Sequence, residues 1–374
     1  MAPTNRAPDA ADSLPTTDWK RSFVRRLLPW FRRHQRDLPW RRSSDPYLVW
    51  ISEIMLQQTQ VVTVIPYFNR FVAAFPTALA LAAADENDVL RHWEGLGYYR
   101  RARQLHAAAK VIVADHAGEF PRTHEEIWRL PGIGRYTAGA VASIAYDQPA
   151  PILEANTIRL LSRLFALPGD PSTAAAQKKL WQLAERVVPP RHCGQFNQAL
   201  MELGSLVCTP KMPRCDVCPV SELCAAFQQG KQDQIPGDKA KPQIEAVREA
   251  AVVVWQRRKV FLRRRAAGER WAGLWDFVRF PLVAQRGVAL RLEIQEKVRE
   301  QAGLSIGDAE KIATLKHGVT RFRITLDCYR AEYTKSKVHL PAGEWQWIAP
   351  KKLELMPLSV TGRKLSKLLE QAQR

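Results

Sequence analysis

Four cysteines lie close together near the middle of the chain. They are Cys208, Cys215, Cys218 and Cys224, with the spacing C-x6-C-x2-C-x5-C. Thiolates grouped in one short loop bind either a zinc ion or a [4Fe–4S] cluster. Zinc sites usually combine two separated C-x2-C pairs, and this loop has only one such pair. The spacing therefore favours the iron–sulfur cluster and leaves zinc as the alternative.

A second candidate site is the tight turn LPGIG at residues 130–134, between helical patterns at Thr123–Leu130 and Arg135–Ala145. Its glycines allow backbone angles that other residues avoid. The helix that follows presents free N–H groups and the positive end of its dipole, which together bind anions. Without a partner the same residues make an ordinary helix–helix turn. Further along the chain, the carboxylate Glu154 lies close to Asn156.

The charge of the chain indicates which anion to expect. Its 56 Lys and Arg against 37 Asp and Glu give a net charge of +19. A surface this basic favours nucleic acid as the partner, with an acidic membrane face as the second choice. No apolar run approaches the ~20 residues of a membrane span, and no basic amphipathic helix stands out. We therefore expect DNA, and no membrane, at the glycine turn.

The N-terminal segment, MAPTNRAPDAADSLPTTD, has no apolar core and is not a signal peptide. We expect a cytoplasmic, nucleoid-associated protein. Six cysteines without a secretory signal predict a reduced compartment, with metal binding rather than disulfides. Cys193 and Cys328 lie away from the other four and are expected in the core.

Apolar periodicity separates a helical part from a mixed part. Asp18 is the expected cap of a first helix ending near Arg33, and a long helix is expected over Leu48–Gln60. No strand pattern appears before residue 245. Strands are expected at Glu249–Leu262, Leu274–Leu282 and Phe322–Tyr333, and helices at Ala289–Ala302 and Thr361–Gln371. The expected divisions are a disordered tail (1–17), a helical region (18–228), a linker (229–247) and an α+β domain (248–372).

Several stretches resemble a known family. Residues 130–140 resemble the helix-hairpin-helix of base-excision DNA glycosylases, the endonuclease III superfamily, and the cysteine loop resembles its iron–sulfur loop. Four segments closely resemble the MutY family of adenine DNA glycosylases: LPWR (38–41), DPYLVWISEIMLQQTQVVTVIPYF (45–68), GLGYYRRARQLH (95–106) and FNQALMELGSLVCT (196–209). The match covers about residues 20–230. Residues 248–372 resemble, more loosely, the family's Nudix-like (MutT-like) domain.

The resemblance implies a multidomain fold. An all-α helix-hairpin-helix glycosylase core would contain a six-helix barrel over about residues 37–147. The N-terminal helix and residues 148–228 would form the subdomain that carries the [4Fe–4S] cluster on the four cysteines. The α+β Nudix-like domain would recognise 8-oxoguanine. The implied partner is double-stranded DNA with A:8-oxoguanine or A:G mispairs, bound by a monomer.

The resemblance also implies the reaction, which is hydrolysis of the N-glycosidic bond of a flipped adenine without strand cleavage. Glu53 matches the general acid that protonates adenine N7. Its apolar neighbours should bury it and raise its pKa. Tyr136 stands where strand-nicking relatives carry a lysine, so no Schiff base forms there. We expect the Tyr136 hydroxyl to hydrogen-bond the carboxylates.

The chain departs from the family at the second carboxylate. The family motif is D-G-N-V, and this chain reads Glu154-Ala155-Asn156-Thr157. We expect Glu154 to stabilise the oxocarbenium ion and Asn156 to bond the sugar or the carboxylate. Because glutamate is one methylene longer, and a displacement of ~1 Å can cost around a hundredfold in rate, impaired catalysis or a changed substrate are alternatives.

The remaining matches concern DNA contacts. Gln57, Gln58 and Tyr98 match residues that fill the duplex after base flipping. Arg41 matches a residue of the adenine pocket, and the N–H groups of Gly132 and Gly134 would bind a phosphate.

The family's F-S-H loop for 8-oxoguanine reads Val319-Thr320-Arg321 in this chain. Thr320 keeps the hydroxyl, whereas Arg321 would bond either a guanine edge or only a phosphate. Two further alternatives follow, a glycosylase with altered base or opposite-base choice and a lesion-binding homologue with little activity. In the Nudix box, Lys297 and Gln301 replace carboxylates, so we expect no nucleotide hydrolysis.

Overall fold

The structure is a computed structural model that describes residues 15–238, 243–319, 321–334 and 345–371. The chain divides into two compact units. The first comprises Met1–Ala83 and Gln104–Lys241, and the second comprises Ala84–Arg103 and Pro242–Arg374. The stretch 84–103 thus groups with the C-terminal residues in this division. The domain boundaries expected from the sequence stay a prediction.

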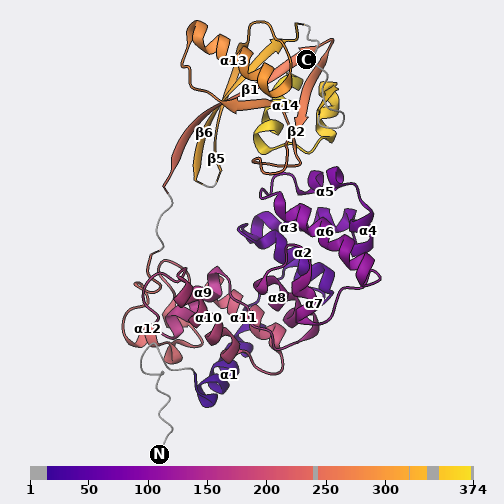
Figure 1. The fold of residues 1–374 in the computed structure, drawn as a ribbon. Coiled ribbons are helices and arrows are strands. Elements are labelled where there is room, and N and C mark those ends of the chain that lie inside the picture. The colour runs from indigo at the N-terminus through magenta and orange to yellow at the C-terminus, as the bar shows by residue number, and fades with distance from the viewer. Residues whose placement is uncertain (1–14, 239–242, 320, 335–344, 372–374) are drawn as a thin grey trace, which may run out of the picture. The chain divides into compact units, whose positions relative to one another are not determined.

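The described part of the first unit is helical (Figure 1). Its helices are α1 (Thr17–His34), α2 (Pro46–Leu56), α3 (Val61–Ala74), α4 (Ala78–Ala83), α7 (His124–Arg129), α8 (Arg135–Tyr146), α9 (Ala155–Leu164), α10 (Ala174–Val187), α11 (Cys193–Leu206) and α12 (Ala225–Gln228), with 3-10 turns η1 (Pro39–Arg41), η2 (Cys215–Val217) and η3 (Ser221–Leu223). Helix α6 (Arg100–Asp115) begins in the second unit and continues into the first. Among the described residues no strand precedes Glu245, as the sequence predicted.

Two expected helix ends were wrong. The side chain of Thr16, not Asp18, caps α1 by accepting the N–H of Trp19. Asp18 lies in the first turn of α1, where its charge favours the helix dipole. Helix α2 ends at Leu56 rather than Gln60, because Gln58 adopts a left-handed conformation with φ +56° that an α-helix cannot contain.

One apolar core of the first unit joins α1 to α9, α10 and α11. The ring of Phe23 on α1 is fully buried, stacks on Trp19 at 5.0 Å and meets Phe196 of α11 edge-on at 5.8 Å. Cys193 is also fully buried in this core, as expected. Such packing holds α9 and α11 together, and both helices carry residues of the candidate site.

The second unit combines helices with a seven-stranded sheet. Its elements are α5 (Glu86–Trp93), β1 (Glu245–Gln256), β2 (Lys259–Arg264), β3 (Trp275–Asp276), β4 (Val278–Pro281), α13 (Gly287–Ala302), β5 (Glu310–Val319), β6 (Phe322–Glu332), β7 (Trp345–Ile348), η4 (Pro350–Leu355) and α14 (Val360–Gln371). Strand β1 pairs in parallel with β6 and antiparallel with β2 and β4, and β5 pairs antiparallel with β6.

The sheet of the second unit is covered on both faces. Alternate residues of β1 enter different cores, with Val253 beside α14 and Val252 beside α13. Side chains that alternate between faces in this way are typical of a strand buried on both sides. Cys328 of β6 is fully buried, as expected for a core residue.

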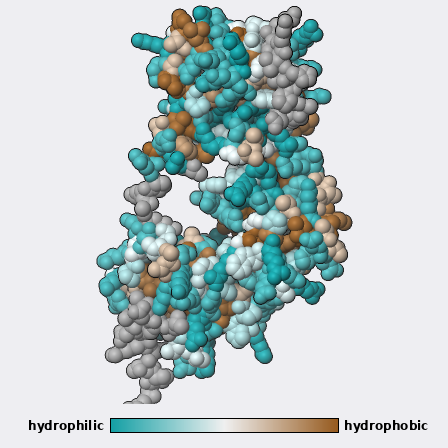
Figure 2. Space-filling view, viewed as in Figure 1, coloured by the Kyte–Doolittle hydropathy of each residue, from teal (hydrophilic) through white to brown (hydrophobic). Residues whose placement is uncertain are grey.

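Figure 2 shows a mostly hydrophilic surface on the face in view, with apolar residues scattered over it. Within the described ranges, no helix combines the length and apolar character needed to span a bilayer.

We predict that Phe23→Ala strongly destabilises the first unit. Truncating a fully buried phenylalanine removes apolar contacts and leaves a cavity, which costs about 3–5 kcal/mol. The melting temperature of the helical unit should therefore fall by about 10 °C. Arg21→Ala is the control, because Arg21 lies on the same helix and forms an exposed ion pair with Asp18. Differential scanning calorimetry checks both variants, and equal melting temperatures would contradict the proposed core.

Candidate active site

Glu53 and Tyr136 form a buried hydrogen-bonded pair between α2 and α8. Glu53 is 4% exposed, and the hydroxyl of Tyr136 donates to its Oε2 at 2.5 Å. The pKa of Glu53 is raised to about 7, mainly by burial and in part by the nearby charge of Glu154, while the hydrogen bond from Tyr136 and the charge of Arg41 oppose the shift. A carboxyl with this pKa is about half protonated at neutral pH and can donate a proton. Its burial is what the apolar neighbours in the sequence predicted.

Glu154 is the N-cap of α9. Its Oε1 accepts the backbone N–H of Thr157 at 2.9 Å, and its Oε2 accepts the N–H of Asn156 at 2.9 Å. The Asn156 amide also donates to Oε2 at 3.3 Å. The pKa of Glu154 is raised overall, because the effect of burial is larger than the opposing effect of these hydrogen bonds and of the nearby Arg159 charge. The longer glutamate side chain therefore folds back onto its own helix and lies at the positive end of the helix dipole.

Asn156 is held in place by Arg159 one turn further along α9. Arg159 Nη2 donates to Asn156 Oδ1 at 2.9 Å and to the Gly204 carbonyl at 2.6 Å. Its Nε donates to the carbonyl of Cys208 at 2.7 Å. A continuous set of hydrogen bonds thus runs from the carboxylate of Glu154 to the first cysteine of the loop.

Glycine at position 204 is required by the packing of α11 on α9. A Cβ atom at Gly204 would lie 2.7 Å from the Cβ of Asn156. That separation is shorter than carbon atoms tolerate, and the neighbouring atoms belong to the start of α9. The backbone of α11 therefore approaches Asn156 as closely as it can.

Glu202 is a site residue that sequence reasoning missed. Its fully buried carboxylate accepts Arg41 Nη2 at 2.9 Å and binds Arg36 through Nε at 2.9 Å and Nη2 at 2.8 Å. Burial raises the pKa of Glu202, but the hydrogen bonds from both arginines outweigh it and hold the pKa at about 2. Arg41 also lowers the pKa of Glu53, so Glu202 belongs to the same site. The sequence offered one signal for Glu202, because it is the single glutamate in the apolar run Ala199–Leu206.

The glycine turn has the geometry of an anion site. Gly132 has φ +74°, and a Cβ there would lie 2.5 Å from the Cβ of Gln104, so only glycine fits. Gly134 is the N-cap of α8 and has no side chain to cap the first turn. The N–H groups of that turn are thus left to a ligand or to water.

The other predicted DNA contacts lie at irregular backbone positions. Gln57 donates from Nε2 to Thr137 Oγ1 at 3.3 Å, next to Gln58 in its left-handed conformation. Tyr98 belongs to the second unit, has φ +48° and is half exposed. Arg321 is exposed beside the Phe322 ring, with its guanidinium 5.0 Å from the ring centroid. Thr320 lies outside the described residues.

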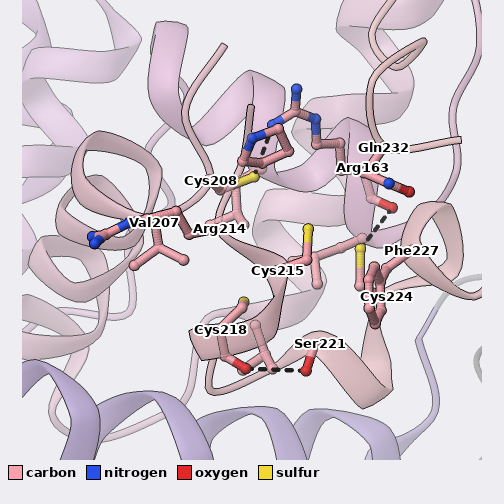
Figure 3. Close-up of a pocket in the computed structure, with 14 residues that line it drawn as sticks. Arg163, Val207, Cys208, Arg214, Cys215, Cys218, Ser221, Cys224, Phe227 and Gln232 are labelled. Carbon is pink, nitrogen blue, oxygen red and sulfur yellow. Dashed lines mark hydrogen bonds between the residues drawn. The ribbon is translucent and has the colours of Figure 1, made fainter. Parts of the chain in front are cut away.

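The four cysteines of the loop line one pocket (Figure 3). None of them forms a disulfide. Arg163 Nη1 donates to the sulfur of Cys208 at 3.4 Å, and the thiol of Cys224 donates to the Arg163 carbonyl at 3.3 Å. Arg163 is itself buried, and it also donates to the carbonyls of Thr209 and Ile235. The loop is therefore built around one arginine of α9.

The chemistry of this loop suits a metal group bound through thiolates. Four thiols can ligate either a zinc ion or an iron–sulfur cluster, and the buried guanidinium would lie beside the anionic thiolates. In the described part of the chain, no three or more His, Cys, Asp or Glu side chains are spaced to hold a metal ion. A zinc ion would draw its sulfurs to about 2.3 Å from one point. Burial raises the pKa of Cys218 to about 12 and that of Cys224 to about 11, so these thiols lose their protons only on binding metal.

Comparison with known proteins now identifies the family. Residues 51–186 match the HhH-GPD superfamily of base excision DNA repair proteins, and residues 250–368 match the NUDIX domain. An adenine DNA glycosylase of Buchnera aphidicola subsp. Schizaphis graminum is 38% identical over 69% of this chain and 75% of its own length. The chain belongs to the adenine DNA glycosylase family. Its glycosylase core and Nudix-like domain are therefore the multidomain fold expected from the sequence.

Two further comparisons show how much of each protein is similar to this chain. The rat adenine DNA glycosylase is 46% identical over 60% of this chain, yet the match covers only 45% of the rat protein. The chain thus spans less than half of the mammalian relatives that it matches. A solved thermostable thymine-DNA glycosylase is 31% identical and superposes with a TM-score of 0.52, covering 57% of this chain and 98% of that one.

We predict that Glu53→Gln stabilises the protein at neutral and alkaline pH. The Glu53 carboxyl has a pKa of about 7 when folded and 4.5 ordinarily, so between these values only the unfolded chain is ionised there. Stability of the natural protein therefore falls as pH rises through this range. Glutamine cannot ionise, so the variant gains up to about 3 kcal/mol by pH 8 and little at pH 4.

Thermal melts of both proteins between pH 4 and pH 8 check this prediction. Glu119→Gln is the control, because the Glu119 side chain is exposed to solvent. A gain of equal size at both ends of the pH range would contradict a raised pKa at Glu53.

Proposed function

We propose that this member of the adenine DNA glycosylase family hydrolyses the N-glycosidic bond of adenine mispaired with 8-oxoguanine or guanine in DNA. The observation that carries the proposal is a pair of carboxyls, buried Glu53 and partly buried Glu154, which differ in their hydrogen-bond partners. Glu53 has a near-neutral pKa and one donor, Tyr136. Glu154 is held by backbone N–H groups, as an ionised carboxylate would be.

The chemistry proceeds with these groups in separate roles. Glu53 gives its proton to adenine N7, so the base can leave as a neutral molecule when the bond between C1′ and N9 breaks. The sugar is left with a positive charge, which the ionised form of Glu154 stabilises. Water then adds to C1′ and releases a proton. Tyr136 has no amine, so the abasic product is not held as a Schiff base and the reaction stays monofunctional.

The adenine pocket is assigned to Arg41, and Glu202 holds that arginine in place. The Glu202 carboxylate accepts four hydrogen bonds, three from the backbone N–H, Nε and Nη2 of Arg36 and one from Nη2 of Arg41, which occupy both of its oxygens. It stays ionised at all working pH values because its pKa is about 2. This permanent charge fixes the direction of the Arg41 guanidinium, which the family resemblance places beside the flipped adenine.

The same proposal assigns the contacts to duplex DNA, bound by a monomer. Gly132 and Gly134 would donate N–H groups to a phosphate, while Gln57, Gln58 and Tyr98 would fill the space left by the flipped base. Asn156 positions Glu154 or bonds the sugar. Thr320 and Arg321 would contact the opposite strand. The net charge of +19 supports binding to the phosphate backbone.

We also propose that Cys208, Cys215, Cys218 and Cys224 hold a [4Fe–4S] cluster. When bound, the group would supply a structural crosslink rather than a step of the hydrolysis. Arg163 would neutralise part of its negative charge and keep the loop attached to α9.

A second candidate function is a lesion-binding homologue with little activity. The observation that favours it is the engagement of both Glu154 oxygens as a helix cap, which leaves fewer lone pairs for the sugar. The experiment below separates the two functions.

The decisive measurement is single-turnover adenine release from duplexes with A opposite 8-oxoguanine, G or T. We expect release opposite 8-oxoguanine and G, slowed at least about a hundredfold by Glu53→Gln. Glu154→Asn is the matched variant for the second carboxylate, because asparagine still caps a helix but carries no charge. It should also slow release about a hundredfold while leaving the melting temperature nearly unchanged.

The contrary outcome is tight binding to the lesion duplex with no release by the natural protein. That result would favour the lesion-binding function. Glu154→Asp tests its cause, since the shorter side chain moves the carboxylate by about one methylene, and a gain in rate would attribute the lost activity to the length of residue 154.

We predict that the purified protein is brown and that Cys218→Ser loses most of the visible absorbance. Iron in such clusters is bound by cysteine thiolates, and a serine oxygen is a poor replacement for a thiolate. Cys193→Ser is the control, because Cys193 lies in the same apolar core but does not line the pocket that the four loop cysteines share. Absorption spectroscopy with iron and zinc analysis checks the result, and a colourless protein with stoichiometric zinc would contradict the cluster.

A further inference from the structure

The turn that presents Tyr98 has an unusual backbone. Helix α5 ends at Trp93, and the next residues include Gly95 with φ +103°, Gly97 with φ +73° and Tyr98 with φ +48°. The indole N–H of Trp93 donates to the Gly97 carbonyl at 3.0 Å. A non-glycine residue in the left-handed region costs roughly 1–3 kcal/mol. The surrounding contacts must therefore hold Tyr98 in this conformation.

The strongest of these contacts is the ion pair between Glu94 and Arg363, both within the second unit. Arg363 Nε donates to Glu94 Oε1 at 2.6 Å, and its Nη2 donates to Oε2 at 2.9 Å. The two side chains are only 9% and 16% exposed. A forked, desolvated arginine–carboxylate pair is among the strongest polar contacts in proteins and fixes the direction of both side chains.

Arg363 is itself fixed by the chain that precedes α14. Its Nη1 donates to the Leu353 carbonyl at 2.7 Å, and its Nη2 donates to the Met356 carbonyl at 2.6 Å. The Arg363 guanidinium thus donates to two backbone carbonyls in addition to the Glu94 carboxylate. A lysine could supply the charge at this place but not the fork.

A second contact holds the far side of the turn. The hydroxyl of Tyr99 accepts the N–H of Gly95 at 3.3 Å and donates to the Leu358 carbonyl at 3.4 Å. Leu358 forms a bridge to Trp275 of β3, so the contact reaches the sheet. The residues on either side of Tyr98 are therefore attached to the chain between η4 and α14.

Tyr98 lies between these two anchored segments. Its side chain is half exposed, and the guanidinium of Arg101 lies 5.3 Å from its ring centroid. The turn is thus anchored on both sides of a residue that projects outward. Such a geometry suits an aromatic side chain that must enter a base stack without being pushed aside.

We propose that Arg363 is a positioning residue for Tyr98: through Glu94 it holds the turn at residues 95–99, so that Tyr98 can insert into the duplex when adenine is flipped. The inference rests on the proposed function, in which Tyr98 fills the duplex. Arg363 touches neither the base nor the reacting atoms. It affects base extrusion through the direction of Tyr98.

The second unit offers a matched control for this inference. Arg264 pairs with Glu86 at 2.7 Å, at the other end of α5, but these two side chains are 35% and 40% exposed. Exposed pairs contribute little to stability or position. Arg363→Met and Arg264→Met therefore remove the same charge from the same unit, and only the first should alter the turn.

Two readouts test the variants with a duplex that places A, or the fluorescent analogue 2-aminopurine, opposite 8-oxoguanine. One is the single-turnover rate of adenine release, and the other is the fluorescence rise as 2-aminopurine leaves the stack. We expect Arg363→Met to lower both by about tenfold and Arg264→Met to leave both within about twofold. Glu94→Gln should resemble Arg363→Met, and Arg363→Lys should fall between.

A double-mutant cycle with Tyr98→Ala distinguishes positioning from general destabilisation. If Arg363 acts through Tyr98, Arg363→Met has no further effect once Tyr98 is removed. Losses that multiply, or equal losses in Arg363→Met and Arg264→Met, would overturn the inference. If Arg363→Met does not fold, Arg363→Lys and Glu94→Gln complete the same cycle.

The same experiment separates failure of the inference from failure of the proposed function. A natural protein that releases no adenine contradicts the proposed function, and 2-aminopurine extrusion then decides the role of Arg363 alone. A Tyr98→Ala variant that extrudes the base as well as the natural protein overturns the role of Tyr98 and, with it, that of Arg363.

Discussion

The hydrogen bond between Tyr136 and Glu53 is buried in the protein interior, away from water. The rest of the site depends on this desolvation. A solvated Glu53 would ionise and could not give up a proton near neutral pH. Its burial requires α2 and α8 to pack closely, and Tyr136, at the start of α8, then supplies one donor that keeps the group oriented. The glycine turn comes directly before α8, and Gly134 leaves the N–H groups of the first turn without a side-chain cap. The proposed acid chemistry and the proposed phosphate contact thus depend on the same part of the structure.

Much of this arrangement could be predicted from the sequence, because local patterns determine it. The apolar neighbours of Glu53 predicted its burial, and the spacing of four cysteines predicted that they share one loop. The boundaries of α13 and α14 followed from their periodicity to within two residues. Strand β5 was missed because most of its residues are polar or half exposed, so that its apolar alternation is weak.

Other features depend on contacts between distant residues and left no local signal. Glu202 looks like one polar residue in an apolar helix, and only folding brings Arg36 and Arg41 to it. The early end of α2 depends on the left-handed backbone at Gln58, which nothing in the local pattern requires. The difference between the family's aspartate and Glu154 was readable, but its consequence was not. The added methylene lets the carboxylate fold back to cap α9, so one side chain now serves both the helix and the proposed chemistry.

The close approach of α11 to Asn156 affects how natural variation in such a protein should be interpreted. Gly204 has no side chain to take part in chemistry and lies inside a regular helix, where alanine is ordinarily the better residue. Judged by residue type alone, a methyl group at this position would count as a conservative change. Because that methyl group would meet Asn156 at 2.7 Å, it would displace the neighbour of Glu154. A list of important positions drawn up from ligand contacts alone would omit this glycine, although the distance between two helices at the site depends on it.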